Sequence, residues 1–185
     1  WSLGLSLALR GLVAGILSVH LVAVMVSYGI PESTSGLLVG FYSWARIPTM
    51  LALALVANKW QPSKVIGVGA FGGALGLLAF FLMDQPNLWL VAAFLTLIAL
   101  NDGSWTVAWS IIADFFGRTH FGALRGGLLT MVSVGAMAGP AYAGWVFDEF
   151  GTYDWVMLPG CIGLVLAGIL NWTMPVTGYR KKLDS

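Results

Sequence analysis

Charged residues are scarce in this chain of 185 residues: aspartate, glutamate, lysine and arginine together make up 9% of it, whereas 58% is hydrophobic. A soluble globular domain carries about 25% charged residues. The shortage excludes a water-exposed surface of ordinary size. We therefore predict an integral membrane protein, surrounded by membrane lipid and without a nucleic-acid partner.

Cysteine and catalytic motifs are also nearly absent. The single cysteine, Cys161, excludes an intramolecular disulfide framework and a multi-cysteine metal site. No His-Glu-x-x-His zinc motif occurs. A rhomboid-like intramembrane protease has a six-helix core of this size, but it needs a Gly-x-Ser-Gly serine and a histidine on a later helix. His20 falls in the first apolar segment and His120 in a loop, so we predict no enzyme, no cofactor and no metal.

Long apolar segments are what the sequence has in abundance. A hydrocarbon core of ~30 Å needs about 20 helical residues. Six segments qualify, at about 3–28, 35–57, 64–83, 88–115, 122–147 and 155–175, and no separate soluble domain fits between them. The predicted fold class is an all-α membrane protein with six transmembrane helices. The chain starts at Trp1 without a methionine, and its first apolar run is too long for a signal peptide, so we expect a fragment of a longer protein.

Basic residues gather in alternate breaks between these segments. They are Lys59 and Lys64, then Arg118 and Arg125, then Arg180, Lys181 and Lys182 in the tail, whereas the intervening breaks carry acids only. By the positive-inside rule the basic side is cytoplasmic, so both termini are expected inside and the number of spans is even. We expect a multi-pass protein of a bacterial inner (plasma) membrane.

Arg46 is a cation deep inside the segment 35–57. It lies 11 residues from either end of that segment, about 16 Å of helix, which is too far for easy snorkelling. A central arginine is costly and normally faces a cavity or a partner. Tyr42 shares its face at i, i+4 spacing, and a guanidinium beside a hydroxyl suits carboxylate recognition. Arg46 is thus predicted to bind substrate, with a structural ion pair as the alternative.

Asp102 is the natural counter-charge for Arg46, because no other acid lies deep in a predicted span. It is predicted either to carry a proton or to neutralise Arg46. Asn101, Trp105 and Trp109 share a stripe at four-residue spacing, and Trp44 on the second segment is a candidate to face them. Asn101, Trp105 and Trp44 are therefore further candidate substrate contacts, although such aromatic stripes also arise from plain packing.

Two charged or titratable residues lie in the first segment. His20 is a candidate for proton coupling, because histidine titrates near neutral pH; a neutral histidine hydrogen-bonded across helices is the alternative. Arg10 lies nearer the cytoplasmic end. It is expected to snorkel to the headgroups or to close the floor of a cavity.

Two stretches resemble the major facilitator superfamily, in particular the branch of oxalate/formate and monocarboxylate transporters. ADFFGRTHFGALRGG (113–127) resembles the loop between the tenth and eleventh helices, and GAMAGPAYAGWVFDEFGTYDW (135–155) the eleventh helix and its exit loop. His20 with Gly29 and Gly36 is similar to the seventh-to-eighth helix region. One departure is Asn58-Lys59, where the family usually has an Asp-Arg pair.

The resemblance implies that the chain, 1–185, is the C-terminal half of a twelve-helix fold. It consists of two inverted three-helix repeats, 1–83 and 88–175, with a cytoplasmic tail, 176–185. An N-terminal six-helix half is then a missing partner, and substrate binds near the bilayer midplane between the halves. Asp114, Arg118 and Arg125 belong to a cytoplasmic gate loop. In organic-anion members of the family an arginine of the eighth helix binds substrate, which favours that role for Arg46.

The predicted function is secondary transport of a small organic anion by alternating access, with a mono- or dicarboxylate as the small-molecule substrate. Symport and antiport are both open. The alternatives are a non-transporting membrane scaffold or assembly protein, and a transporter of a neutral or cationic solute.

Overall fold

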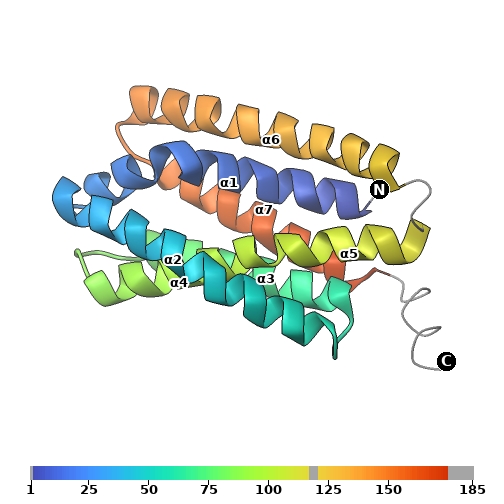
Figure 1. Ribbon diagram of the computed structural model, residues 1–185. Coiled ribbons are helices and arrows are strands. Elements are labelled where there is room, and N and C mark those ends of the chain that lie inside the picture. The colour runs from blue at the N-terminus through green and yellow to red at the C-terminus, as the bar shows by residue number, and fades with distance from the viewer. Residues whose placement is uncertain (1, 117–120, 175–185) are drawn as a thin grey trace.

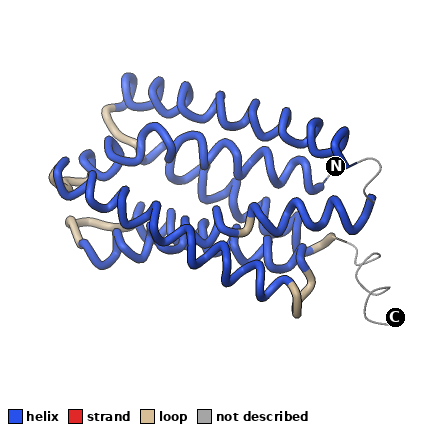
Figure 2. The backbone as a smooth tube through the Cα atoms, viewed as in Figure 1, coloured by secondary structure: helices blue, strands red, loops and turns tan. Residues whose placement is uncertain are grey.

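The computed structural model describes residues 2–116 and 121–174, without the side chains of 114–116, and every element within these residues is a helix (Figure 2). The helices are α1 (Ser2–Ser27), α2 (Glu32–Ala57), α3 (Pro62–Phe81), α4 (Leu88–Gly103), α5 (Trp105–Phe116), α6 (Phe121–Phe150) and α7 (Asp154–Trp172). In the described part, six spans are long and apolar enough to cross a membrane. The all-helical, six-span fold class is confirmed.

The fourth span contains a break that the sequence analysis did not anticipate. Helix α4 ends at Gly103, Ser104 forms a tight turn, and α5 starts at Trp105. The run Asn101-Asp102-Gly103-Ser104 favours such a break, because these residues are weak helix formers whose side chains compete for backbone hydrogen bonds. The break places polar groups within an otherwise apolar span.

The helices lie side by side with their ends at two opposite faces of the bundle (Figure 1). Helix α1 packs along α6, α4 packs along α2, and α3 packs along α7. The first helix of each predicted repeat thus contacts the second helix of the other repeat: α1 contacts α6, and α4 contacts α2. A twofold axis relating 1–83 to 88–175 would produce this reciprocal pattern of contacts. The start of α1 and the end of α7 lie at the same end of the bundle, as an even number of crossings requires (Figure 1).

Close approach of α1 and α6 depends on small residues. A Cβ added at Gly15 would lie 2.3 Å from the carbonyl oxygen of Ala136, and one at Gly139 would lie 2.4 Å from that of Leu12. Helices in lipid associate by such backbone-to-backbone packing, because apolar side chains gain little by leaving a hydrocarbon solvent.

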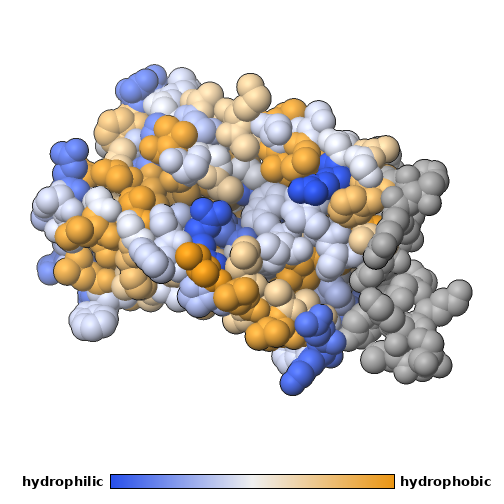
Figure 3. All heavy atoms as spheres, in the orientation of Figure 1, coloured by the Kyte–Doolittle hydropathy of each residue, from blue (hydrophilic) through white to orange (hydrophobic). Residues whose placement is uncertain are grey.

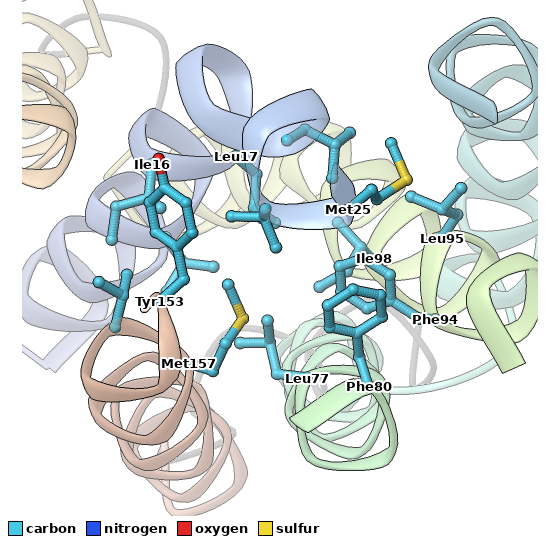
Figure 4. Packing of buried hydrophobic residues seen from close by; sticks show 14 of the residues in the cluster. Ile16, Leu17, Met25, Leu77, Phe80, Phe94, Leu95, Ile98, Tyr153 and Met157 are labelled. Carbon is cyan, nitrogen blue, oxygen red and sulfur yellow. The ribbon is translucent and has the colours of Figure 1, made fainter. Parts of the chain in front are cut away.

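The hydrophobic core lies where α1, α3, α4 and α7 meet. Figure 4 shows the side chains of Leu17, Leu77 and Met157 pointing toward one another beside the aromatic pair Phe80 and Phe94. The two rings of that pair lie 4.6 Å apart between centroids, a favourable aromatic contact. This packing holds α4 in place up to its break.

Helices α2 and α6 have few buried residues. Within α2 only Ser35 and Leu53 are buried, and large apolar side chains cover the rest of its surface, among them Leu37, Trp44, Leu51 and Leu55. The face of the molecule in Figure 3 shows apolar residues among residues of intermediate hydropathy, with strongly hydrophilic residues in small patches. A surface of this kind is suited to lipid or to further transmembrane helices.

Candidate functional site: a buried carboxylate between two arginines

The side chains of Arg46 and Asp102 come together from α2 and α4. Nε of Arg46 lies 3.6 Å from Oδ2 of Asp102, and this is the salt bridge found among the described residues. Its two members differ in environment, since the Arg46 side chain is 54% exposed and that of Asp102 is 6% exposed. The carboxylate is thus buried inside the bundle, while about half of the Arg46 side chain is exposed.

Tyr42 binds both members of this pair. Its hydroxyl donates a hydrogen bond to the same Asp102 oxygen that faces Arg46, and the Arg46 guanidinium lies 5.6 Å from the centre of the Tyr42 ring. A cation over an aromatic face is attracted by the ring quadrupole. The i, i+4 spacing of Tyr42 and Arg46 on α2 produces this arrangement.

The other carboxylate oxygen of Asp102 is held within α4. Nδ2 of Asn101 donates to Oδ1 of Asp102 at 3.3 Å. Asn101 is itself buried and accepts a hydrogen bond from Nε of Arg10 at 3.0 Å. The amide of Asn101 therefore connects Arg10 on α1 to the carboxylate.

Arg10 is fully buried, so the expectation that it snorkels to the membrane surface was wrong. Its Nη2 donates to the backbone carbonyl of Asn101 at 2.5 Å and to Oγ of Ser104 at 2.7 Å. Its guanidinium lies 4.9 Å from the centre of the Trp105 ring. The break between α4 and α5 supplies these partners, because it leaves polar groups that an unbroken apolar helix would not offer.

The three tryptophans that were predicted to lie near one another, Trp44, Trp105 and Trp109, have different surroundings. Trp105 is half-buried beneath Arg10, and Trp109 lies against Arg125, whose guanidinium is 5.0 Å from its ring centre. Trp44 is 75% exposed and makes none of the aromatic contacts found among residues 2–116 and 121–174. Because Trp44 lies two residues before Arg46, it projects from a different side of α2. Its contact with substrate stays a prediction.

His20 belongs to a second cluster toward the other end of α1. Its Nε2 lies 3.2 Å from the carbonyl oxygen of Pro140 on α6, and its Nδ1 lies 3.2 Å from the hydroxyl of Tyr153. A carbonyl only accepts, so in this geometry Nε2 carries the hydrogen and Nδ1 accepts from Tyr153. Ten residues of helix, about 15 Å, separate His20 from Arg10.

The predicted gate loop is described only in part. Arg118 and the side chain of Asp114 lie outside the described residues. Arg125, at the start of α6, has its guanidinium 5.0 Å from the Trp109 ring of α5 and 5.9 Å from the Phe121 ring. Arg125 thus joins α5 to α6 on the side of the bundle where Lys59 and Lys64 also lie.

Comparison with known proteins identifies the family. The model of the Major Facilitator Superfamily matches residues 3–184, nearly the whole chain. The chain belongs to the Major Facilitator Superfamily. An uncharacterized MFS-type transporter of Schizosaccharomyces pombe is 28% identical over 151 residues, a match that covers 80% of this chain and 33% of that protein. The chain therefore spans about a third of the length of this relative. No solved structure matches.

Membership of the Major Facilitator Superfamily, with six apolar helices, makes this an integral multi-pass membrane protein and points to a transporter rather than an enzyme. Among the described residues, no group of three or more histidine, cysteine or acidic side chains is placed to hold a metal ion. The cluster around Asp102 consists of Arg10, Tyr42, Arg46, Asn101, Asp102 and Ser104. These side chains can form hydrogen bonds and ion pairs with a ligand.

Two residues of the cluster in this major facilitator chain were missed by sequence reasoning. Arg10 was expected to snorkel or to close the floor of a cavity, without a partner being named, and Ser104 was not considered. A signal was present, since Asn101 and Ser104 form an i, i+3 polar pair in an apolar span. Such a pair requires a partner from another helix when it is buried.

Proposed function

We propose that this chain is the C-terminal half of a secondary transporter that moves a small organic anion, a mono- or dicarboxylate, by alternating access. The observation that carries the proposal is the half-exposed side chain of Arg46, whose guanidinium is held by a buried carboxylate and an aromatic ring. A guanidinium fork matches a carboxylate in geometry as well as in charge. Arg46 is the proposed substrate-binding group.

The balance of charge in the cluster also favours an anion. In their ordinary charged forms Arg10 and Arg46 each contribute one positive charge and Asp102 one negative charge, so the formal sum of the three is one positive charge. A bound monocarboxylate neutralises that excess. A neutral or cationic solute would leave it uncompensated inside the membrane, where an isolated charge is expensive.

Alternating access requires a second bundle for this one to move against. The chain covers a third of its yeast relative, and α2 and α6 expose apolar faces that further helices can cover. We infer that an N-terminal six-helix half packs there and that substrate lies between the halves. In this arrangement Arg46 exchanges Asp102 for the substrate carboxylate during each cycle.

The test is carboxylate binding by the purified full-length transporter, followed as thermal stabilisation and as binding of labelled mono- and dicarboxylates. Arg46→Gln should abolish binding while the protein still inserts and elutes as a single species. Arg46→Lys should retain only a small part of the affinity, because an ammonium keeps the charge but lacks the planar fork.

The matched control is Lys64→Gln, which removes a cation at the start of α3 that lies over Trp172 instead of in the cluster. It should bind carboxylates like the wild type. Unchanged carboxylate binding by Arg46→Gln would contradict the assignment of Arg46. Absence of any anion response from the wild type would favour a scaffold or a transporter of another solute.

A further inference from the structure

We propose that Arg10 is a positioning residue, which holds the α4–α5 break and keeps the Asp102 carboxylate in place when Arg46 turns to substrate. This inference rests on the proposed function only for its effect on substrate affinity. Its structural part, that Arg10 supports Asp102 through Asn101, stands on the geometry of α1 and α4.

The contacts of Arg10 are directed at the break. Nη2 binds the carbonyl of Asn101 and the hydroxyl of Ser104, while Nε binds the side chain of Asn101. The hydroxyl of Ser104 donates in turn to the carbonyl of Asn101 at 2.7 Å. The guanidinium of Arg10, which belongs to α1, thus donates hydrogen bonds to three acceptors around the turn where α4 ends.

Asn101 transmits this hold to the carboxylate. Nε of Arg10 fixes the oxygen of the Asn101 amide, which directs the Nδ2 group toward Oδ1 of Asp102. Tyr42 and Arg46 act on the opposite oxygen, Oδ2. Each oxygen of Asp102 therefore has its own support, one from α1 through α4 and one from α2.

The negative charge of Asp102 explains why support from Arg10 is needed in addition to that from Arg46. Asp102 is nearly buried and interacts electrostatically with both arginines. When Arg46 leaves it for a substrate anion, Arg10 is the remaining cation of the cluster. A buried carboxylate without a cation is strongly unfavourable, so Arg10 allows Arg46 to leave at a lower energetic cost.

The first experiment measures thermal unfolding of the full-length transporter without substrate. Arg10→Gln is compared with the wild type, and the same change is then compared in an Arg46→Gln background. If Arg10 supports Asp102, its loss should lower the melting temperature more when Arg46 is also absent, because Asp102 then has neither cation. Equal decreases in the two backgrounds would overturn the proposal, since a purely structural arginine contributes the same in both.

Ser6→Ala is the matched control. Ser6 is a buried polar residue on the same helix, and its hydroxyl contacts Asn171 and the carbonyl of Ala167 on α7. Its removal should lower the melting temperature equally in both backgrounds. Should Arg10→Gln fail to fold, Arg10→Gln with Asp102→Asn should restore a folded species, because the unpaired carboxylate is gone. Failure of that double variant to fold would also overturn the proposal.

The second experiment measures carboxylate affinity. Arg10→Gln and Asn101→Leu should each weaken binding about tenfold, the usual effect of losing one charge-assisted hydrogen bond, and the double variant should be little weaker than either. Additive losses would overturn the path through Asn101. A wild type that binds no carboxylate would refute the proposed function, while the thermal comparison would still decide the role of Arg10.

Discussion

Arg46 and Asp102 form an unequal pair, in which an arginine side chain that is 54% exposed lies 3.6 Å from a carboxylate that is 6% exposed. The carboxylate is fixed by hydrogen bonds from Tyr42 and Asn101, whereas the Arg46 guanidinium has the carboxylate and the Tyr42 ring as its ion-pair and cation–π partners in the described part of the chain. The arginine is therefore the less constrained member of the pair. This asymmetry is what exchange between Asp102 and a substrate carboxylate requires.

Asp102→Asn should bind carboxylates more tightly than the wild type and transport them more slowly. The change removes the internal competitor for Arg46 and a repulsive charge near the substrate. A partly exposed ion pair contributes about 0.5 kcal/mol, so binding should improve about twofold to threefold. Equilibrium binding and initial uptake rates in liposomes measure the two effects separately.

Glu32→Gln is the control for this prediction, since Glu32 is an exposed acid in the first turn of α2. Glu32→Gln should change neither the carboxylate affinity nor the initial rate of uptake. Weaker carboxylate binding by Asp102→Asn would show that Asp102 orients Arg46 for the substrate instead of competing with it.

Tyr42→Phe should destabilise the transporter and leave the ring contact with Arg46 in place. The buried Asp102 oxygen loses its hydrogen-bond donor, which costs about 1–3 kcal/mol of unfolding free energy. Tyr42→Leu should cost about 0.5–1 kcal/mol more through loss of the cation–π contact. Unfolding in detergent with increasing denaturant measures both.

Tyr142→Phe provides the comparison for the hydroxyl. The Tyr142 hydroxyl donates to the carbonyl of Trp155 at 2.8 Å, and the contact is exposed. Loss of this hydroxyl should lower the free energy of unfolding less than Tyr42→Phe does. Equal effects would mean that the bond to Asp102 contributes no more than a surface hydrogen bond.

Gly103→Ala should destabilise the site, because there is no space for a side chain at the break. An added Cβ would lie 2.9 Å from the backbone nitrogen of Met50 and 3.0 Å from the carbonyl carbon of Thr49. Overpacking of this kind costs about 1–3 kcal/mol, and moving α2 away would separate Arg46 from Asp102. The melting temperature and carboxylate affinity should therefore both fall.

Gly144→Ala tests the same substitution in α6, where a Cβ would meet nothing within 4 Å. Alanine favours helix over glycine, so this variant should be as stable as the wild type or more so. Similar behaviour of the two alanine variants would show that α2 and α4 separate easily at the break.

The sequence was sufficient for the six spans and for the two partners of the central charge pair. Spans are defined by local hydrophobicity, which needs no knowledge of packing. Asp102 was identified as the partner of Arg46 because no other acid lies deep in a span. The structure places their side chains together, whereas the role of each in transport stays a prediction.

The burial of Arg10 could not be predicted in the same way. Arg10 lies toward one end of the predicted segment 3–28, and that position alone permits snorkelling. Its side chain reaches the end of α4 and the turn at Ser104, which together offer three acceptors. These contacts join residues about ninety positions apart, and the polar pair Asn101 and Ser104 does not indicate which residue of another helix reaches it.

His20→Asn should lower the melting temperature without changing the pH dependence of carboxylate uptake. Both ring nitrogens of His20 are engaged in hydrogen bonds that join α1 to Pro140 and Tyr153, so a structural role is favoured over proton coupling. Burial raises the pKa of Tyr153, and the nearby Asp148 raises it further. The Tyr153 hydroxyl thus stays protonated and continues to donate to His20 across the physiological range.

The same pKa shift gives this cluster a defined pH window. A tyrosine whose pKa is raised on folding stabilises the fold fully below the unfolded value of about 10, and this contribution is lost as the pH rises above it. Tyr153→Phe should therefore flatten the decline of melting temperature above about pH 10, while His20→Asn should leave that decline in place. A pH profile of uptake that disappears in His20→Asn but persists in Tyr153→Phe would instead assign proton coupling to the imidazole.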